Sequence, residues 1–376
     1  MFWLAFRLAL HNRVRLVLTL LGVVFSSYLT LTEVALYVGM MENATSLIRH
    51  ADADIWIASK GIRNFDFAKL FPASRVKAIG DDADMLWSRN IMQTWGFLKL
   101  PDGSQEQVEI IGYDPKYPVG GPWEMATGSA ASVGSGANII LDESSSQRLG
   151  RLKLGSTWEL NDQKVHLIGL SRSVKTFTTA PIVFTSFSYA QRVSSDVARD
   201  DGTAFTAIKL RRRSDSDRVT ARLRQNLPDN AVISSHDFVR RTIIYWTAET
   251  GMGAAFCLTA FLGLIVGGGV IGQTVFANTM EHLGELATLK AMGATNANLD
   301  ILIISQAVID ASVGYAIGVA LVFLAQPTLE RYGVSLSLRW ELLVSLLIFF
   351  LTIGVAAAFF SIRRVRRVDP AIVFRS

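Results

Sequence analysis

Cysteine and histidine are scarce in this chain of 376 residues. The one cysteine, Cys257, has no second cysteine in the chain to pair with, and the five histidines are scattered without the short spacings of zinc ligands. No segment matches the phosphate-binding pattern G-x-x-x-x-G-K-[ST]; the nearest stretch, 169–176, lacks the second glycine. We therefore expect no metal site, no directly bound cofactor and no enzymatic activity in this chain.

Charged residues are scarce in four long apolar stretches, residues 16–41, 251–276, 301–325 and 342–362. Each reaches the roughly 20 residues that a helix needs to cross the hydrocarbon core of a bilayer. The first stretch is too long for a signal peptide, and no small-x-small cleavage site follows it. The pattern predicts an α-helical membrane protein with four transmembrane helices, one plus three. A large mixed α+β extracytoplasmic domain, residues 42–250, is inserted between helices 1 and 2.

Arginine residues at the two ends of the chain predict its orientation. They precede the first apolar stretch at Arg7, Arg13 and Arg15 and follow the fourth at Arg363, Arg364, Arg366, Arg367 and Arg375. Because cytoplasmic segments are rich in Lys and Arg, both ends are expected in the cytoplasm. Four spans then place the loop 277–300 in the cytoplasm, although its only basic residue besides His282 is Lys290, and the short loop 326–341 outside it. Most of the net charge of +5 therefore reflects topology and is weak evidence for nucleic-acid binding.

The amino-terminal segment 1–15 mixes aromatic residues with arginines. This composition suits a helix that lies in the cytoplasmic interface of the membrane, with its aromatic side chains in the headgroup layer. A simple continuation of the first span is the alternative. Residues 363–376 are expected to form a basic cytoplasmic tail.

Short alternating or apolar runs in the central domain predict strands, and helical patterns lie between them. The strands are expected at 53–58, 108–113, 138–141, 165–170, 182–185 and 204–210, and the helices at 67–79, 143–149 and 216–225. A further short strand at 231–234 would complete a βαβ-like element with the strand at 204–210 and the helix that follows it.

Glycine residues recur four apart within the apolar stretches. The pairs are Gly263 with Gly267, Gly268 with Gly272, and Gly314 with Gly318. Small residues at this spacing let helix backbones approach closely in a membrane, so these pairs predict tight helix packing.

Two acidic residues interrupt the apolar stretches. Asp310 lies in the middle of the third stretch, with Gln306 one turn before it on the same face. Polar groups at this depth are expected to face the helix bundle, where they serve either substrate or proton handling or plain hydrogen bonding between helices. Glu33 lies about 25 Å along the first helix from residue 16, near the outer interface, where it either reaches water or contacts substrate.

The loop 277–300 contains a predicted helix. Asn278 and Glu281 have the spacing of a capping box, apolar residues recur at helical intervals from Met280 to Met292, and Gly293 supplies a stop signal. A helix that is apolar on one side suits docking in a groove of another protein. The alternative is a short helix that lies on lipid.

Three segments resemble motifs of a known family, the MacB/FtsX-type permeases of ABC transporters, which have the type VII ABC fold. Residues 4–22 are similar to the family's entry into its first span, residues 281–294 to its cytoplasmic coupling helix, and residues 366–371 to its terminal basic and Asp-Pro signature. The ATLKAMG form at 287–293 resembles the DevC branch, whose members export glycolipid-like cargo through a tripartite envelope assembly. The external segments 110–115 and 140–143 are also similar to the family.

The resemblance implies a permease subunit in the bacterial inner membrane that forms a homodimer and works with a separate cytoplasmic ATPase subunit. ATP and Mg²⁺ would be bound by that ATPase, and a periplasmic adaptor and an outer-membrane channel are further expected partners. The residues expected to contact the ATPase are Met280, Glu281, Leu283, Glu285, Leu286, Leu289, Lys290, Met292 and Gly293.

The function implied is the export or extraction of an envelope substrate by mechanical transmission of ATPase motion. The resemblance leaves the substrate open among lipid or glycolipid-like molecules, heme, drugs and peptides. Heme would be a substrate only, with Glu33 a candidate contact. The alternative is an FtsX-like regulator that passes ATPase motion to an envelope protein without transporting cargo.

Overall fold

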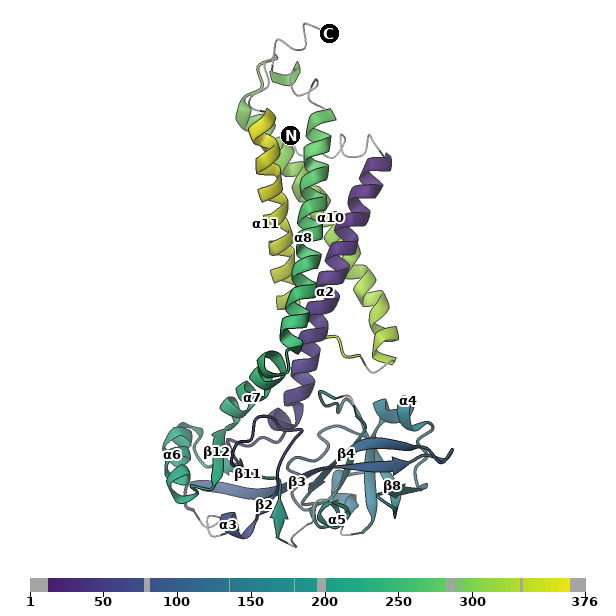
Figure 1. Cartoon of the computed structure of the whole chain (residues 1–376), viewed down its shortest axis with the longest axis vertical. Coiled ribbons are helices and arrows are strands. Elements are labelled where there is room, and N and C mark those ends of the chain that lie inside the picture. The colour runs from purple at the N-terminus through teal and green to yellow at the C-terminus, as the bar shows by residue number, and fades with distance from the viewer. Residues whose placement is uncertain are drawn as a thin grey trace. The chain divides into compact units, whose positions relative to one another are not determined.

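The computed structural model contains a helical unit and a strand-rich unit (Figure 1). The helical unit comprises Met1–Val38, Ala254–Glu330 and Ser335–Ser376, and the strand-rich unit comprises Gly39–Gly253 and Arg331–Val334. The residues that the structure describes are 13–77, 82–134, 136–178, 180–194, 201–281, 284, 288–290, 292–331 and 334–365.

Four long helices in the described residues have the length and composition to cross a membrane. They are α2 (Arg13–His50), α8 (Met252–Glu281), α10 (Asn296–Arg331) and α11 (Trp340–Val365). The prediction of four spans in a one-plus-three order, with a mixed α/β domain between the first and second, is therefore confirmed. Figure 1 shows α2, α8 and α11 running alongside one another while α10 crosses them obliquely.

The helices are longer than the apolar stretches that predicted them. Helix α2 has 38 residues, about 57 Å at 1.5 Å per residue, and so exceeds the thickness of the hydrocarbon core. Its first residues, 13–15, belong to the span helix and not to a separate interfacial helix; residues 1–12 of that predicted helix lie outside the described part of the chain.

Helix structure extends into both ends of the predicted external loop 326–341, because α10 continues to Arg331 and α11 begins at Trp340. Pro327 lies inside α10 without ending it. One contact that supports the extra turn is the hydrogen bond from Gln326 Nε2 to Glu330 Oε1, 2.8 Å long, between side chains four residues apart.

The strand-rich unit contains a ten-stranded sheet in the order β12-β1-β11-β3-β4-β9-β6-β8-β5, with β7 paired to β3 and β8. Its strands are β1 (Ile55–Ser59), β3 (Met85–Lys99), β4 (Gln105–Tyr113), β5 (Met125–Thr127), β6 (Asn138–Asp142), β7 (Thr157–Leu160), β8 (Gln163–Ser171), β9 (Ile182–Ser186), β11 (Phe205–Leu210) and β12 (Asn230–Ser234). Strands β2 (Phe71–Pro72) and β10 (Gly202–Thr203) form a separate pair.

Strand β3 joins the two halves of this sheet. Its first part, from Met85 to Ile91, pairs with β11, and its second part, from Met92 to Lys99, pairs with β4. Helices and helical turns are α3 (Ser74–Lys77), η1 (Ala130–Val133), η2 (Glu143–Ser145), α4 (Ser146–Leu149), α5 (Phe187–Val193), η3 (Arg213–Asp215), α6 (Ser216–Asn226), α7 (Ser235–Ile244) and the π-helical turn η4 (Tyr245–Glu249).

The predicted strands of this unit are all present, and the βαβ-like element occurs in a split form. Strands β11 and β12 flank β1 and both run antiparallel to it, so they are parallel to each other and α6 is the crossover. The predicted helix 67–79 is wrong over most of its described length. Pro72 disfavours helical backbone at Phe71, and the two residues pair instead with Thr203 and Gly202 in β10, leaving only α3 as helix.

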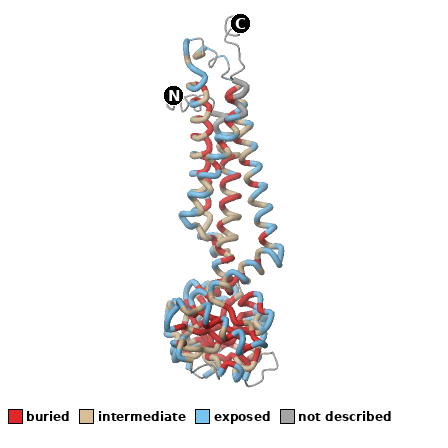
Figure 2. Tube along the Cα trace, turned by 90° about the vertical axis from the view of Figure 1, so that its left-hand side faces the viewer, coloured by how far each residue is buried: buried red, intermediate tan, exposed pale blue. Residues whose placement is uncertain are grey.

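Buried residues concentrate inside the strand-rich unit, while the four long helices carry many exposed residues along their length (Figure 2). The largest buried cluster of the strand-rich unit centres on aromatic rings, with Phe65 stacked on Phe205 at a centroid distance of 4.7 Å and Trp56 edge-on to both. The exposed helix residues Leu258, Phe261 and Ile265 are apolar, as expected for side chains that face lipid.

Candidate functional site

Two adjacent serines on α2 bind the backbones of two neighbouring helices. Ser26 Oγ donates a hydrogen bond to the carbonyl oxygen of Gly263 in α8, 2.5 Å away. Ser27 Oγ lies 3.3 Å from the carbonyl oxygen of Gly314 in α10 and also donates to Val24 within its own helix. Because successive residues of a helix point about 100° apart, α2 can bind α8 on one side and α10 on the other.

The glycines at these contacts have no room for a side chain. A Cβ on Gly267 would overlap Ser26, a Cβ on Gly318 would overlap Ser27, and a Cβ on Gly263 would lie 2.7 Å from Thr30 Oγ1. Two of the predicted pairs, Gly263 with Gly267 and Gly314 with Gly318, thus lie against α2.

The third glycine pair lies against another helix. A Cβ on Gly268 would lie 3.0 Å from Ile353, and one on Gly272 3.5 Å from Ala357, both in α11. Sequence reasoning missed Ser26 and Ser27, although two consecutive small hydroxyl residues in an apolar span were a usable signal.

Gln306 and Asp310 lie on the buried side of α10, together with Ala307 and Ala311. Asp310 is 2% exposed and Gln306 is 7% exposed, and the Nε2 atom of Gln306 has no hydrogen-bond partner among the described residues. Glu33 is half-buried on α2, and the described residues show no hydrogen bond or ion pair that joins it to Gln306 or Asp310. Gln306 and Asp310 thus share the buried face of α10, as predicted from their spacing.

The end of the predicted coupling helix has the geometry of a Schellman motif. The N–H of Gly293 donates to Lys290 O at 3.1 Å and the N–H of Ala294 donates to Leu289 O at 3.0 Å, while Gly293 has a φ of +97°. Leu289 packs against the apolar core of the helical unit, whereas Met292 is 79% exposed.

The remaining residues of that predicted set lie in α8, at the described end of the loop helix, or outside the described residues. Met280 and Glu281 are the last two residues of α8, and Lys290 is half-buried. Leu283, Glu285 and Leu286 lie outside the described residues.

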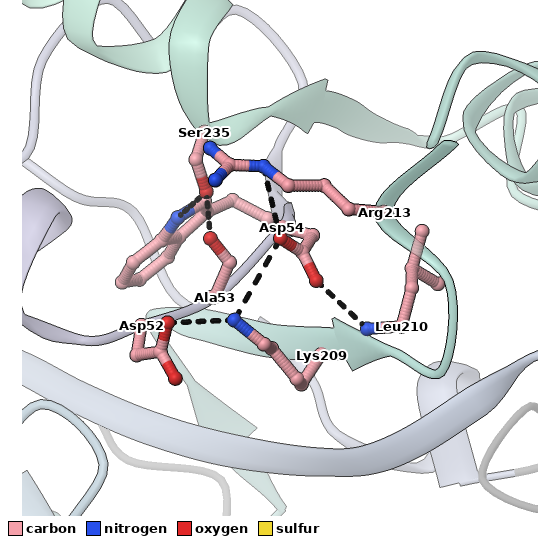
Figure 3. Close-up of polar contacts among 8 residues, drawn as sticks. Asp52, Ala53, Asp54, Lys209, Leu210, Arg213 and Ser235 are labelled. Carbon is pink, nitrogen blue, oxygen red and sulfur yellow. Dashed lines mark hydrogen bonds and ion pairs between the residues drawn. The ribbon is translucent and has the colours of Figure 1, made fainter. Parts of the chain in front are cut away.

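A polar cluster in the strand-rich unit surrounds Asp54, a buried carboxylate four residues beyond the end of α2 (Figure 3). Its Oδ2 accepts the N–H of Leu210 at 3.0 Å, and its Oδ1 lies 3.8 Å from Lys209 Nζ and 3.7 Å from Arg213 Nε. Lys209 also pairs with Asp52 at 2.6 Å. The cluster thus holds the segment after α2 against the end of β11.

Ser235, the first residue of α7, binds the same segment (Figure 3). Its Oγ donates to the carbonyl oxygen of Ala53 and accepts the indole N–H of Trp56 at 3.0 Å, and its N–H donates to Asp54 O at 2.9 Å. Along the chain, Asp54 follows α2, and α7 with η4 precedes α8. The two segments of this unit that continue into the first and second spans are therefore bonded directly to each other.

A pair of buried acids lies elsewhere in the strand-rich unit. Asp66 is 1% exposed and Glu109 is fully buried. Gln93 Nε2 donates both to the main-chain carbonyl oxygen of Asp66, at 2.6 Å, and to Oε1 of Glu109, at 3.0 Å. Burial raises the pKa of Asp66 to about 7. Burial, together with the neighbouring Asp66, also raises the pKa of Glu109 well above its ordinary value.

This acid pair contacts the turn that precedes α8. Trp246, in η4, donates its indole N–H to Asp66 Oδ2 at 3.3 Å, and Phe177 stacks on the Trp246 ring at 3.6 Å. The Oε2 atom of Glu109 is buried and has no hydrogen-bond partner among the described residues. Sequence reasoning did not select these residues, because single acids in strands and loops carry no recognisable spacing.

Two family models match the chain in tandem. The model of the MacB-like periplasmic core domain matches residues 16–226, more than half of the chain, and the model of the FtsX-like permease C-terminal region matches residues 257–370. A curated relative, an uncharacterized ABC transporter permease of Methanocaldococcus jannaschii, is 19% identical over 295 residues, which cover 74% of this chain and 70% of that protein.

Solved structures similar to this chain include two external domains. The periplasmic region of MacB from Actinobacillus actinomycetemcomitans is matched with 14% identity and a TM-score of 0.39, over 52% of this chain and 95% of that one. The extracellular domain of the noncanonic ABC-type transporter YknZ from Gram-positive bacteria is matched with 8% identity and a TM-score of 0.36, over 48% and 98%. By the two family models, the chain belongs to the MacB/FtsX-like family of ABC transporter permeases.

Proposed function

We propose that this chain is the permease subunit of an ABC transporter in a bacterial inner membrane, and that it converts ATP hydrolysis by a separate ATPase chain into movement of its extracytoplasmic domain. The observation that carries the proposal is the bonding of Ser235 to Ala53 and Asp54. Because these residues belong to the two segments that continue into α2 and α8, a relative movement of those helices would be applied at one point of the domain.

The ATPase contact is proposed at the helix that ends in the Gly293 Schellman motif. Leu289 packs against the core of the helical unit and Met292 is exposed, so a partner subunit could bind Met292 while the helix stays attached to the bundle. An apolar side chain at such a position suits insertion in a groove of the partner.

The close helix contacts suit transmission of motion through the bundle. With Ser26 bonded to Gly263 and Ser27 to Gly314, α2 has little freedom to slide against α8 or α10 without breaking a hydrogen bond or creating overlap. We infer that the helices tilt as packed rods. The chain would act as a homodimer over two ATPase subunits, and its substrate would be an envelope molecule such as a lipid or glycolipid, heme, a drug or a peptide.

Further partners follow from the likeness to the DevC branch. A periplasmic adaptor and an outer-membrane channel would complete a tripartite exporter, and ATP and Mg²⁺ would be held by the ATPase. Glu33, Gln306 and Asp310 are proposed as polar groups that substrate or helix movement would affect.

The ATPase contact can be tested by replacing Met292. The tagged full-length chain would be co-expressed with each ABC ATPase subunit of the source organism, and the captured complex would be assayed for ATP turnover in nanodiscs. Met292→Arg is expected to prevent capture of the ATPase because a charge would enter an apolar groove, and Met292→Leu, the matched control, is expected to retain it.

Capture and turnover unchanged in Met292→Arg would show that the docking assignment is wrong. A captured complex whose turnover responds to an added envelope protein, in cells without an export defect, would favour the FtsX-like regulator over the exporter.

A further inference from the structure

A cavity of about 920 Å³ opens in the strand-rich unit where the two halves of the sheet meet. The parallel strands β4 and β9 both end there, with Tyr113 paired to Ser186, and the residues around and after those ends, 114–116 and 186–188, line the cavity. Strand β3 contributes 88–90, just before its partner changes from β11 to β4. In open α/β sheets, ligands commonly bind beyond the carboxyl ends of neighbouring parallel strands.

Charged side chains in the cavity lining favour an anion. Among the described residues, the lining includes Lys77, Arg89 and Lys116 and two acids, Asp114 and Asp201, so positive charge is in excess by one in this set. Both acids are already bonded to main-chain N–H groups: the two carboxylate oxygens of Asp201 accept the N–H of Ser74 at 3.1 Å, and Asp114 Oδ1 accepts the N–H of Lys116 at 3.0 Å.

Arg89 is held in place but has an unsatisfied donor. Its guanidinium lies over the ring of Tyr117, 4.1 Å from the centroid, and Nη1 donates to Ser88 O at 2.8 Å. Its Nε atom is buried without a hydrogen-bond partner among the described residues. A buried donor without a partner is unfavourable, and a hydrogen bond from the accessible part of the same guanidinium to an oxyanion would be charge-assisted and strong.

Asn90, the next residue of β3, points to the opposite face of the strand from Arg89, where its Oδ1 accepts the hydroxyl of Thr206 at 2.7 Å. Apolar side chains, Val76, Pro115 and Phe187 among them, make up much of the remaining lining. The volume falls in the range of cavities that hold a drug-sized molecule.

We propose that this cavity binds a small amphipathic anion, a phosphate or carboxylate group on an apolar body. Arg89 and Lys116 bind the oxyanion, and Val76 and Phe187 contact the apolar part. The site lies wholly within the strand-rich unit and requires no ATPase, so the inference goes beyond the proposed transport function and can fail without it.

The test uses the full-length chain in phosphatidylcholine nanodiscs with 1-naphthyl phosphate as the probe, and empty nanodiscs as the blank. Titration calorimetry is expected to give saturable binding at least tenfold tighter than that of 1-naphthol or of inorganic phosphate, each of which has one half of the probe. 1-Naphthoate, measured in parallel, identifies whether the site prefers a carboxylate or a phosphate.

Arg89→Gln is expected to weaken binding of 1-naphthyl phosphate at least tenfold. The matched control, Arg212→Gln, removes an exposed arginine of the same unit that does not line the cavity and should leave binding unchanged. Because Arg89→Gln also removes the contact with Tyr117 and could affect folding, Lys116→Gln, at an exposed position, provides a second variant and should weaken binding about threefold.

If 1-naphthol bound as tightly as 1-naphthyl phosphate, the anionic group would not be recognised. If inorganic phosphate bound as tightly, the apolar lining would not contribute to binding. Either result overturns the proposal. So does unchanged binding in both Arg89→Gln and Lys116→Gln. None of these results would bear on the Met292 experiment, which measures capture of the ATPase.

Discussion

The indole N–H of Trp246 lies 3.3 Å from Oδ2 of Asp66, a residue 180 positions earlier in the chain. Trp246 belongs to η4, the turn that precedes α8, and Asp66 belongs to a loop of the strand-rich unit. Because the acid is buried, its proton occupancy determines whether this contact is made to a neutral or an ionised carboxyl group. The protonation state of the pair Asp66 and Glu109 is therefore linked to η4, the turn that leads into the second span.

Stability of the strand-rich unit is expected to fall as pH rises. The pKa of Asp66 is about 7 in the folded chain and near 3.8 when unfolded, so the folded state binds more protons between these values, and the free energy of unfolding decreases from about pH 4 to pH 7. The raised pKa of Glu109 acts in the same direction. Thermal unfolding of the purified chain should show a midpoint lower at pH 7.5 than at pH 5 by about 5 °C or more.

Asp66→Asn should flatten this pH dependence, because an amide accepts the Trp246 bond without titrating. Asp229→Asn, at an exposed position of the same unit, serves as the control and should keep the wild-type slope. An unchanged slope in Asp66→Asn would mean that Asp66 does not bind the extra proton.

Helix packing predicts different responses from two glycines of α8 that lie two residues apart. A Cβ on Gly267 would overlap Ser26, whereas a Cβ on Gly269 would meet no atom within 4 Å. Gly267→Ala should destabilise the chain by about 1–3 kcal/mol, in the range of overpacked cores, and Gly269→Ala should be neutral or slightly stabilising. Thermal unfolding in detergent measures both, and equal effects would contradict the packing described for α2 and α8.

The spans and most strands could be predicted from the sequence because each depends on a local pattern: length and apolarity for the helices, and alternation or apolar runs for strands such as β4 and β8. Strand β3 was missed, since it changes partners at Ile91 and Met92 and its exposed and buried residues do not alternate regularly. The glycine pairs were found by spacing.

The polar contacts of the candidate sites could not be predicted in the same way. Ser235 and Ala53 are hydrogen-bonded although they lie 182 positions apart in the chain, and Asp66 and Trp246 are hydrogen-bonded at a separation of 180 positions. Such pairings are set by the order of strands in the sheet, which no local pattern specifies. Nor did the sequence separate Met292, which is exposed, from Leu289, which packs inward.

The Asp54 cluster predicts a graded loss of stability. Asp54→Ala removes the acceptor of the Leu210 N–H and leaves Lys209 with Asp52 alone, so unfolding should become easier by about 2–3 kcal/mol. Asp54→Asn keeps one oxygen acceptor and should lose less. Urea unfolding followed by intrinsic tryptophan fluorescence measures the difference, and equal losses in the two variants would show that the backbone acceptor role of Asp54 is unimportant.

The last prediction concerns the Schellman motif that ends the helix proposed to contact the ATPase. Gly293 has a φ of +97°, which a residue with a Cβ adopts at an energetic cost of about 1 kcal/mol or more, so Gly293→Ala should fray the helix end and move Met292. Asn tolerates left-handed backbone better, and Gly293→Asn is therefore the matched control. ATP turnover of the captured complex should fall in Gly293→Ala and be largely kept in Gly293→Asn. A fall of the same size in both variants would instead indicate that the ATPase requires the absence of any side chain at this position, and that helix geometry is not the cause.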